Sequence, residues 1–121
     1  MRKESGRTRK IGELLQRELA SLIPRVVQDP RVGPLTVTAV DVAPDLSHAK
    51  VYITQLTGRA QGAETVKALN HAAGFLRNAL KERVTLRAIP VLRFHYDESV
   101  ERGDAISRLI AKARSEDSGR S

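Results

Sequence analysis

The spacing of apolar residues changes from a helical period to a strand period and back along this chain, and that order constrains its fold more than any other feature. Between Arg7 and Ile23 the apolar side chains recur three or four residues apart, as in an amphipathic helix. They are Ile11, Leu14, Leu15, Leu19, Leu22 and Ile23. Pro24 comes next and is expected to end the helix, and the Asp, Pro and Gly residues of 28–34 predict a loop.

Two segments rich in β-branched residues follow, at 35–43 and 48–56, and both are typical of strands. The sequence PDLS at 44–47 is a turn signal, so the pair is predicted to form an antiparallel hairpin. In the first strand the apolar alternation changes parity between Ala39 and Val40. Such a change indicates a β-bulge or a local twist.

The second half of the chain predicts one more helix and one more strand. Gly58 and Gly62 are expected to bracket a loop, and helical spacing then runs from Val66 to about Arg83. A strand is predicted over 86–97, where Pro90 confines the first half to an edge, a bulge or a strand start. A short helix through Ile106, Leu109 and Ile110 comes last. The order predicts one α+β domain with helices on one face of a small three-stranded sheet.

The predicted helix 66–83 carries an internal glycine, Gly74, which costs about 1 kcal/mol relative to alanine in a helix interior. One side of this run is predicted to be apolar, with Ala72, Phe75, Leu76, Ala79 and Leu80. On a continuous helix Asn70, Gly74, Arg77 and Lys81 would share the opposite face. Two interpretations are open: the bare backbone admits a phosphate beside the cations, or the glycine lets the helix pack closely on the sheet.

The charge balance points to a polyanionic partner. Twenty-one Lys and Arg against fourteen Asp and Glu give a net charge of +7, which favours nucleic acid. The cations form two groups: Arg2, Lys3, Arg7, Arg9 and Lys10, and then Arg77, Lys81, Arg83, Arg87 and Arg93. Our hypothesis is that they form one positive surface, with a flexible N-terminal arm that orders on RNA. The acidic residues Asp97, Glu98, Glu101 and Asp104 would repel RNA from another end of the domain.

Several segments carry a family resemblance. They are "DPRVG" before the first strand, "VTAVDVAPDLSHAKVYIT" across the hairpin, "AAGFLRNAL", and "IPVLRFHYDES" at the last strand. With a basic first helix, this set resembles ribosome-binding factor A, a family of bacterial small-subunit assembly factors, over residues 5–112. The resemblance implies a KH-like domain of type II topology. In that family an Ala-X-Gly kink, matched here by Ala72, Ala73 and Gly74, replaces the GXXG loop that clamps nucleic-acid backbones.

The resemblance also implies where the kink lies and what it does. One helix should end near His71 and the next should start near Phe75, with the backbone between them facing RNA. The implied protein is a non-enzymatic, cytoplasmic monomer that binds 16S rRNA and the free small (30S) ribosomal subunit. It would assist maturation and 5′-end processing of that RNA, also in the cold, with other assembly factors as further candidate partners.

The expected RNA-binding residues come from the kink and from both basic groups. They are Arg7, Arg9, Lys10, Ala72, Ala73, Gly74, Arg77, Lys81, Arg83 and Arg87. We expect the KH-like domain to span 1–113 and a polar, mobile tail to span 114–121. Only Tyr52, Phe75, Phe94 and Tyr96 are aromatic, mostly at core-patterned positions. Shape and phosphate contacts are therefore favoured over base stacking.

Other function classes lack support in the sequence. It contains no GxGxxG, Walker A or GxSxG motif, and no cysteine, and its three histidines do not have metal-ligand spacing. We therefore expect no catalysis, no cofactor and no metal site, and the longest apolar run is too short for a membrane span. The alternative function is a protein-interaction module whose positive charge serves solubility or meets an acidic protein.

Overall fold

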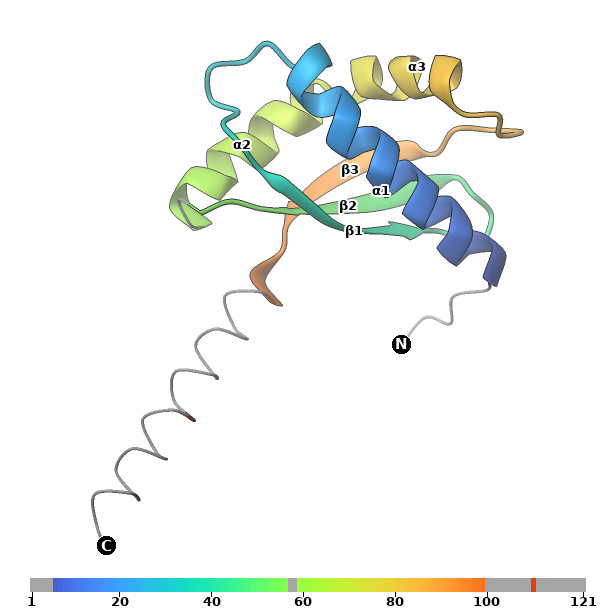
Figure 1. Ribbon diagram of the computed structural model, residues 1–121, viewed down its shortest axis with the longest axis horizontal. Helices are drawn as coiled ribbons and strands as arrows, with labels where there is room; N and C mark the ends of the chain where they lie inside the picture. Colours follow the sequence, from blue (N-terminus) through green and yellow to red (C-terminus); the bar gives the residue numbers. More distant parts are fainter. Residues whose placement is uncertain (1–5, 57–58, 100–109, 111–121) are drawn as a thin grey trace, which may run out of the picture.

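A computed structural model of the chain describes residues 6–56, 59–99 and 110 (Figure 1). Its elements follow the chain as α1 (Gly6–Val26), β1 (Thr36–Val42), β2 (His48–Thr54), α2 (Arg59–His71), α3 (Ala73–Arg83) and β3 (Val91–Tyr96). This order confirms the predicted α+β class. It is also consistent with the KH-like arrangement that the family resemblance implies.

The three strands form one mixed sheet in the order β1-β2-β3. β1 and β2 pair antiparallel, which confirms the predicted hairpin, and their register shifts between Val37 and Ala39, which confirms the predicted bulge. β3 pairs with β2 in parallel. Because a parallel pair needs a long crossover connection, α2 and α3 together carry the chain from the end of β2 to the start of β3.

The three helices lie on one face of this sheet and share one hydrophobic core with it (Figure 1). The strands turn alternate side chains toward the helices, among them Val51, Ile53 and Phe94, which are almost completely buried. Leu15 and Leu19 of α1 and Leu76 and Leu80 of α3 are completely buried against them. Each such burial contributes about 1.5–3 kcal/mol. The core therefore fixes how α3 is oriented and which of its sides remains outside.

Three predicted boundaries are wrong. Pro24 does not end the first helix: α1 continues to Val26, and the Val27 N–H still donates to the Ile23 carbonyl at 3.0 Å, because Leu22 and Ile23 anchor this turn in the core. The third strand starts at Val91 rather than at 86, so Pro90 stands directly before a strand start. Gly62 lies inside α2, not in a loop.

Some predictions fall on residues that the structure does not describe. They concern the last helix at Ile106 and Leu109, the tail 114–121, Gly58, and the charged residues Arg2, Lys3, Glu101 and Asp104. The domain limits 1–113 likewise stay a prediction.

Candidate nucleic-acid interface

The helical run around Gly74 is broken at Ala72. α2 ends at His71 and α3 begins at Ala73, and Ala72 between them has φ −91° and ψ 3°. The Ala72 N–H donates to the carbonyls of Ala68 and Leu69, both at 3.1 Å, and its own carbonyl accepts from Leu76 at 3.0 Å. The chain thus changes direction here without a loop (Figure 1). The implied kink is confirmed, although the second helix starts at Ala73 rather than near Phe75.

Gly74 lies in the first turn of α3 and is exposed. A Cβ atom added at this position would meet no atom within 4 Å. The interpretation that Gly74 allows close packing on the sheet is therefore wrong. What the glycine provides is a bare stretch of main chain that faces open space beside the kink.

Phe75 does not belong to the apolar face on which it is predicted. Leu76 and Leu80 are completely buried, whereas the Phe75 side chain is 75% exposed. All side chains of that predicted face except Ala72 lie within α3, where each residue advances by about 100° around the helix. Phe75 is therefore about 100° from Leu76 and about 140° from Leu80, which puts it outside the buried stripe that these two leucines define.

Two residues of the predicted ligand-binding face instead hold the helices against β3 and the segment just before it. The Asn70 amide donates through Nδ2 to the Phe94 carbonyl at 3.1 Å, and its Oδ1 accepts from the Phe94 N–H at 2.7 Å. This pair of bonds occupies the outer edge of β3 as a neighbouring strand would. Arg77 donates through Nε to the Ile89 carbonyl at 3.0 Å. Asn70 and Arg77 therefore fix the position of the kink relative to the sheet.

Three of the predicted RNA-binding cations meet around one hollow of about 300 Å³ at the end of α3. They are Arg77, Lys81 and Arg87, and the other residues that line it are Val84, Leu86, Ala88 and Ile89. None of the lining residues is acidic, and both Lys81 and Arg87 are exposed. Cations that meet around a hollow with no acidic lining favour an anionic group such as a phosphate. Arg83 is engaged elsewhere: its Nε lies 2.6 Å from Glu18 Oε2 of α1.

The N-terminal cations lie apart from this hollow. Arg7, Arg9 and Lys10 are exposed in the first turns of α1, so they belong to a helix and not to a flexible arm. At 1.5 Å per residue, Arg7 lies about 16 Å along the helix from Glu18, where α3 is attached through Arg83. A ligand that contacts both groups must extend over this distance.

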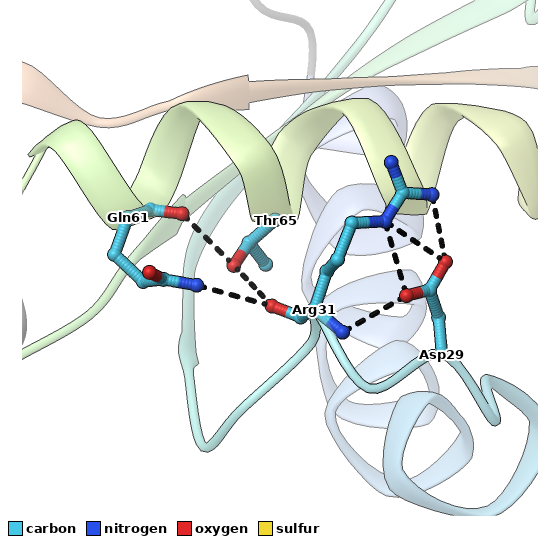
Figure 2. A network of polar contacts seen from close by, with 4 residues as sticks. All are labelled: Asp29, Arg31, Gln61 and Thr65. Atoms are coloured by element: carbon cyan, nitrogen blue, oxygen red, sulfur yellow. Dashed lines mark hydrogen bonds and ion pairs between the residues drawn. The ribbon is translucent and has the colours of Figure 1, made fainter.

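A polar network that the sequence patterns do not reveal ties the α1–β1 loop to α2 (Figure 2). The Asp29 carboxylate accepts bonds from the Arg31 guanidinium, the shortest at 2.7 Å, and one from the Arg31 N–H at 2.9 Å. These bonds lower the pKa of Asp29 to about 2. The Arg31 carbonyl accepts from Thr65 Oγ1 at 3.2 Å and from Gln61 at 3.4 Å. In the sequence, only the Asp-x-Arg spacing of Asp29 and Arg31, which is typical of a local turn, could have suggested the bonds between these two residues.

Asp29 of this network also lines a cleft of about 410 Å³ beside the kink. The cleft lies between the end of α1, the loop at 27–30 and the junction of α2 and α3. Its apolar lining consists of Val26, Val27, Pro30, Ala68, Ala72 and Phe75. Gln28, Asp29 and His71 add polar groups.

The sheet face away from the helices carries charges of both signs. Lys50 and Arg93 are neighbours in register, and the rings of Tyr52 and His95 lie 5.6 Å apart. Burial lowers the pKa of His95, and Lys50 and Arg93 lower it further. Burial alone would raise the pKa of Asp97, but hydrogen bonds from Ser99 and Thr38 outweigh it and lower that pKa. Tyr52 lies on this outer face, whereas Phe94 is in the core. Because acidic and basic side chains are mixed here, the outer face has no uniform positive charge.

The described part of the chain contains no group of three or more His, Asp or Glu side chains that could hold a metal ion. No helix within the described residues is long and apolar enough to cross a membrane.

Comparison with known proteins agrees with this geometry and with the sequence resemblance. The family model described as ribosome-binding factor A matches residues 7–110. A ribosome-binding factor A from Pseudomonas fluorescens is 53% identical over 98% of this chain and 90% of its own length. The crystal structure of ribosome-binding factor A from Thermus thermophilus superposes with a TM-score of 0.64 at 34% identity. That match covers 74% of this chain and 94% of the other.

A second structural relative has been placed on a ribosomal subunit. It is a homology model of Thermus thermophilus ribosome-binding factor A fitted into a cryo-electron microscopy map of its complex with 30S, and it superposes with a TM-score of 0.59 at 36% identity. The match covers 72% of this chain and 91% of the other. Since the family model spans most of the sequence and a relative is more than half identical over nearly all of it, the chain belongs to the ribosome-binding factor A family.

Proposed function

We propose that this chain is a non-enzymatic ribosome assembly factor that binds 16S rRNA on the free small ribosomal subunit. The observation that carries the proposal is the open kink: Gly74 presents bare main chain, and the acid-free hollow lined by Arg77, Lys81 and Arg87 lies along the same helix. The helical N-terminus favours a phosphate near Gly74, and the cations add charge beyond it. The relative fitted into a map of a complex with 30S supports the choice of subunit.

Within this proposal each predicted residue has a different part. Ala72, Ala73 and Gly74 supply the exposed backbone, whereas Lys81 and Arg87 supply free charge. Arg77 acts mainly by positioning α3, and Arg83 contributes only when it leaves Glu18. Arg7, Arg9 and Lys10 would contact a more distant part of the same RNA.

The proposed action is a shift in the folding equilibrium of the RNA. A protein that binds one conformation of 16S rRNA more tightly than another populates that conformation, by no more than the difference in affinity. Maturation and 5′-end processing would then proceed from the favoured conformation. This help is worth most in the cold, where misfolded RNA helices rearrange slowly. The proposed setting is the cytoplasm, and the proposed active form is a monomer.

Co-sedimentation of the purified protein with isolated small subunits across a salt series tests the proposal. Large subunits serve as the control for attraction to any polyanion. Selective binding to small subunits that weakens with salt is expected, because phosphate contacts release counterions. Equal binding to both subunits, or no binding at low salt, would contradict the proposal, and the second result would favour an acidic protein partner instead.

A further inference from the structure

Phe75 is the least expected side chain at the kink. A phenylalanine that is 75% exposed gains little from folding, and it lies directly after the open glycine. Single exposed apolar residues are common, but this one is part of an apolar cleft that continues into the molecule. The cleft floor includes Ala68, which is 2% exposed. An aromatic ring at the mouth of a concave apolar site is typical of a binding surface.

The cleft is already formed by the polar contacts around it. Its outer wall at Asp29 and Pro30 is held by the Arg31 guanidinium and by the bonds from Thr65 and Gln61 to the Arg31 carbonyl (Figure 2). Thr65 is completely buried, and its hydroxyl group, which has one proton to donate, lies 3.2 Å from the Arg31 carbonyl and 2.9 Å from Gln55 Oε1. Gln61 donates to the same Arg31 carbonyl, so the loop has a second attachment to α2. Because Arg31 neutralises Asp29, the wall presents little net charge to a ligand. Binding here needs little reorganisation, which favours affinity.

We propose that the cleft beside the kink binds one unpaired base of the RNA, stacked on the Phe75 ring. This inference rests on the proposed function, since it places the base of a strand whose phosphate lies at Gly74. Consecutive Cα atoms are about 3.8 Å apart, so a phosphate at Gly74 and a base over Phe75 lie within reach of one nucleotide. Recognition of RNA by proteins commonly uses such splayed bases on aromatic rings.

Charge favours RNA over an apolar protein segment as the occupant. The hollow with Lys81 and Arg87, farther along α3, favours a ligand with negative charge next to the part that fills the cleft, and a nucleic acid supplies both an apolar ring and a negative backbone. The polar residues of the cleft suit the edges of a base: Gln28 and His71 carry side-chain donors and acceptors. This assigns to Phe75 a stacking role that the sequence pattern does not favour.

Affinity for isolated small subunits, measured by co-sedimentation, separates the stacked base from other occupants. Phe75→Ala and Phe75→Leu are expected to weaken binding about tenfold or more, whereas Phe75→Tyr stays within about twofold of wild type. Leucine is the informative substitution, because it keeps apolar contact but removes the ring. Leu56→Ala, at another exposed apolar residue just before α2 begins, is the matched control and should bind as wild type.

The identity of the occupant is tested by p-benzoylphenylalanine placed at position 75 or, as the control, at position 56. After irradiation with small subunits, position 75 should crosslink to an unpaired nucleotide of 16S rRNA, visible as a stop in reverse transcription, and position 56 should not. A crosslink to a ribosomal protein would overturn the inference, and so would full binding by Phe75→Leu. If Gly74→Val weakens binding while all Phe75 variants bind normally, only the base pocket is refuted. If the wild-type protein does not bind small subunits, the proposed function fails as well.

Discussion

Gly62 and Gly74 both lie in helices, yet the molecule uses them in opposite ways. Gly62 is buried within α2, and a Cβ atom there would collide with the Tyr96 ring of β3. Gly12 of α1 is similar, because its Cβ would lie 2.6 Å from the Val40 carbonyl oxygen. Gly74, beyond the break at Ala72, has open space instead. Gly12 and Gly62 serve packing, whereas Gly74 leaves main chain exposed, and only the surroundings tell them apart.

The difference extends to the residues around each glycine. Near Gly62 the helix contacts the sheet directly, so the backbone of α2 approaches β3 closely. Around Gly74 the attachments lie elsewhere on the helices. Leu76 and Leu80 pack in the core, the Asn70 amide binds Phe94 of β3, and Arg77 binds the Ile89 carbonyl just before β3. These bonds hold the kink in place without covering it. The fold thus holds in place a stretch of exposed backbone that makes no packing contact at Gly74.

The largest expected effect is on stability. Gly62→Ala should lower the free energy of unfolding by about 1–3 kcal/mol, because the added methyl group overpacks a site already filled by Tyr96. Gly74→Ala should leave it unchanged or raise it by up to about 1 kcal/mol, because alanine favours the helix and meets no neighbour. Urea denaturation of both variants measures the difference. Equal destabilisation by the two substitutions would contradict the comparison.

Binding should show the reverse order. Gly74→Val is expected to leave the fold intact and, because valine favours a helix more than glycine does, to raise the free energy of unfolding by up to about 0.5 kcal/mol. It should weaken binding to small subunits about tenfold, because the side chain obstructs the exposed backbone. Gly74→Ala, with a smaller side chain, serves as the intermediate point. The measurement is co-sedimentation, with circular dichroism as the check on folding. Binding by Gly74→Val at wild-type strength would mean that the kink is not the contact.

The sequence predicts much of this architecture because apolar spacing reports burial directly. The hairpin, the bulge near Ala39 and the order of elements all follow from side chains that alternate between core and solvent. Prediction fails where a contact depends on partners distant in the chain. Gly62 resembles a loop residue until Tyr96 is placed against it, and Pro24 resembles a helix end until the core holds its turn.

The candidate site is less predictable for the same reason. The family resemblance gives the kink at Ala72, Ala73 and Gly74, and charge indicates Lys81 and Arg87. Neither shows that the Asn70 amide binds the edge of β3, since this requires a strand twenty-four residues later in the chain. The exposure of Phe75 is hidden too, because an apolar residue at the margin of a helical stripe can be buried or exposed, depending on what packs beside it.

A smaller effect distinguishes the free cations from the paired one. Lys81→Ala with Arg87→Ala should reduce the slope of log affinity against log salt by about 1.4–1.8, because each phosphate contact contributes about 0.7–0.9. Arg83→Ala is the matched control: its guanidinium is already paired with Glu18, so it should change the slope less than either single substitution. The salt series with small subunits provides the measurement. A larger change for Arg83→Ala would mean that the pair opens on binding and that the hollow is not the main phosphate site.

The smallest expected effect concerns the wall of the cleft and depends on pH. Hydrogen bonds from Arg31 lower the pKa of Asp29 from 3.8 to about 2, so the folded state favours the carboxylate. This contribution to stability is fully present above the unfolded pKa of 3.8 and is lost as the pH falls through about 2, below which the carboxyl is protonated in both states. Asp29→Asn should therefore be slightly less stable than wild type at neutral pH and should approach it in acid. Because the pair is exposed to solvent, the difference is small. Urea denaturation at several pH values measures it, and a gap that stays constant down to pH 2 would show that the charge of Asp29 does not hold the wall, leaving the bonds from Thr65 and Gln61 to do so.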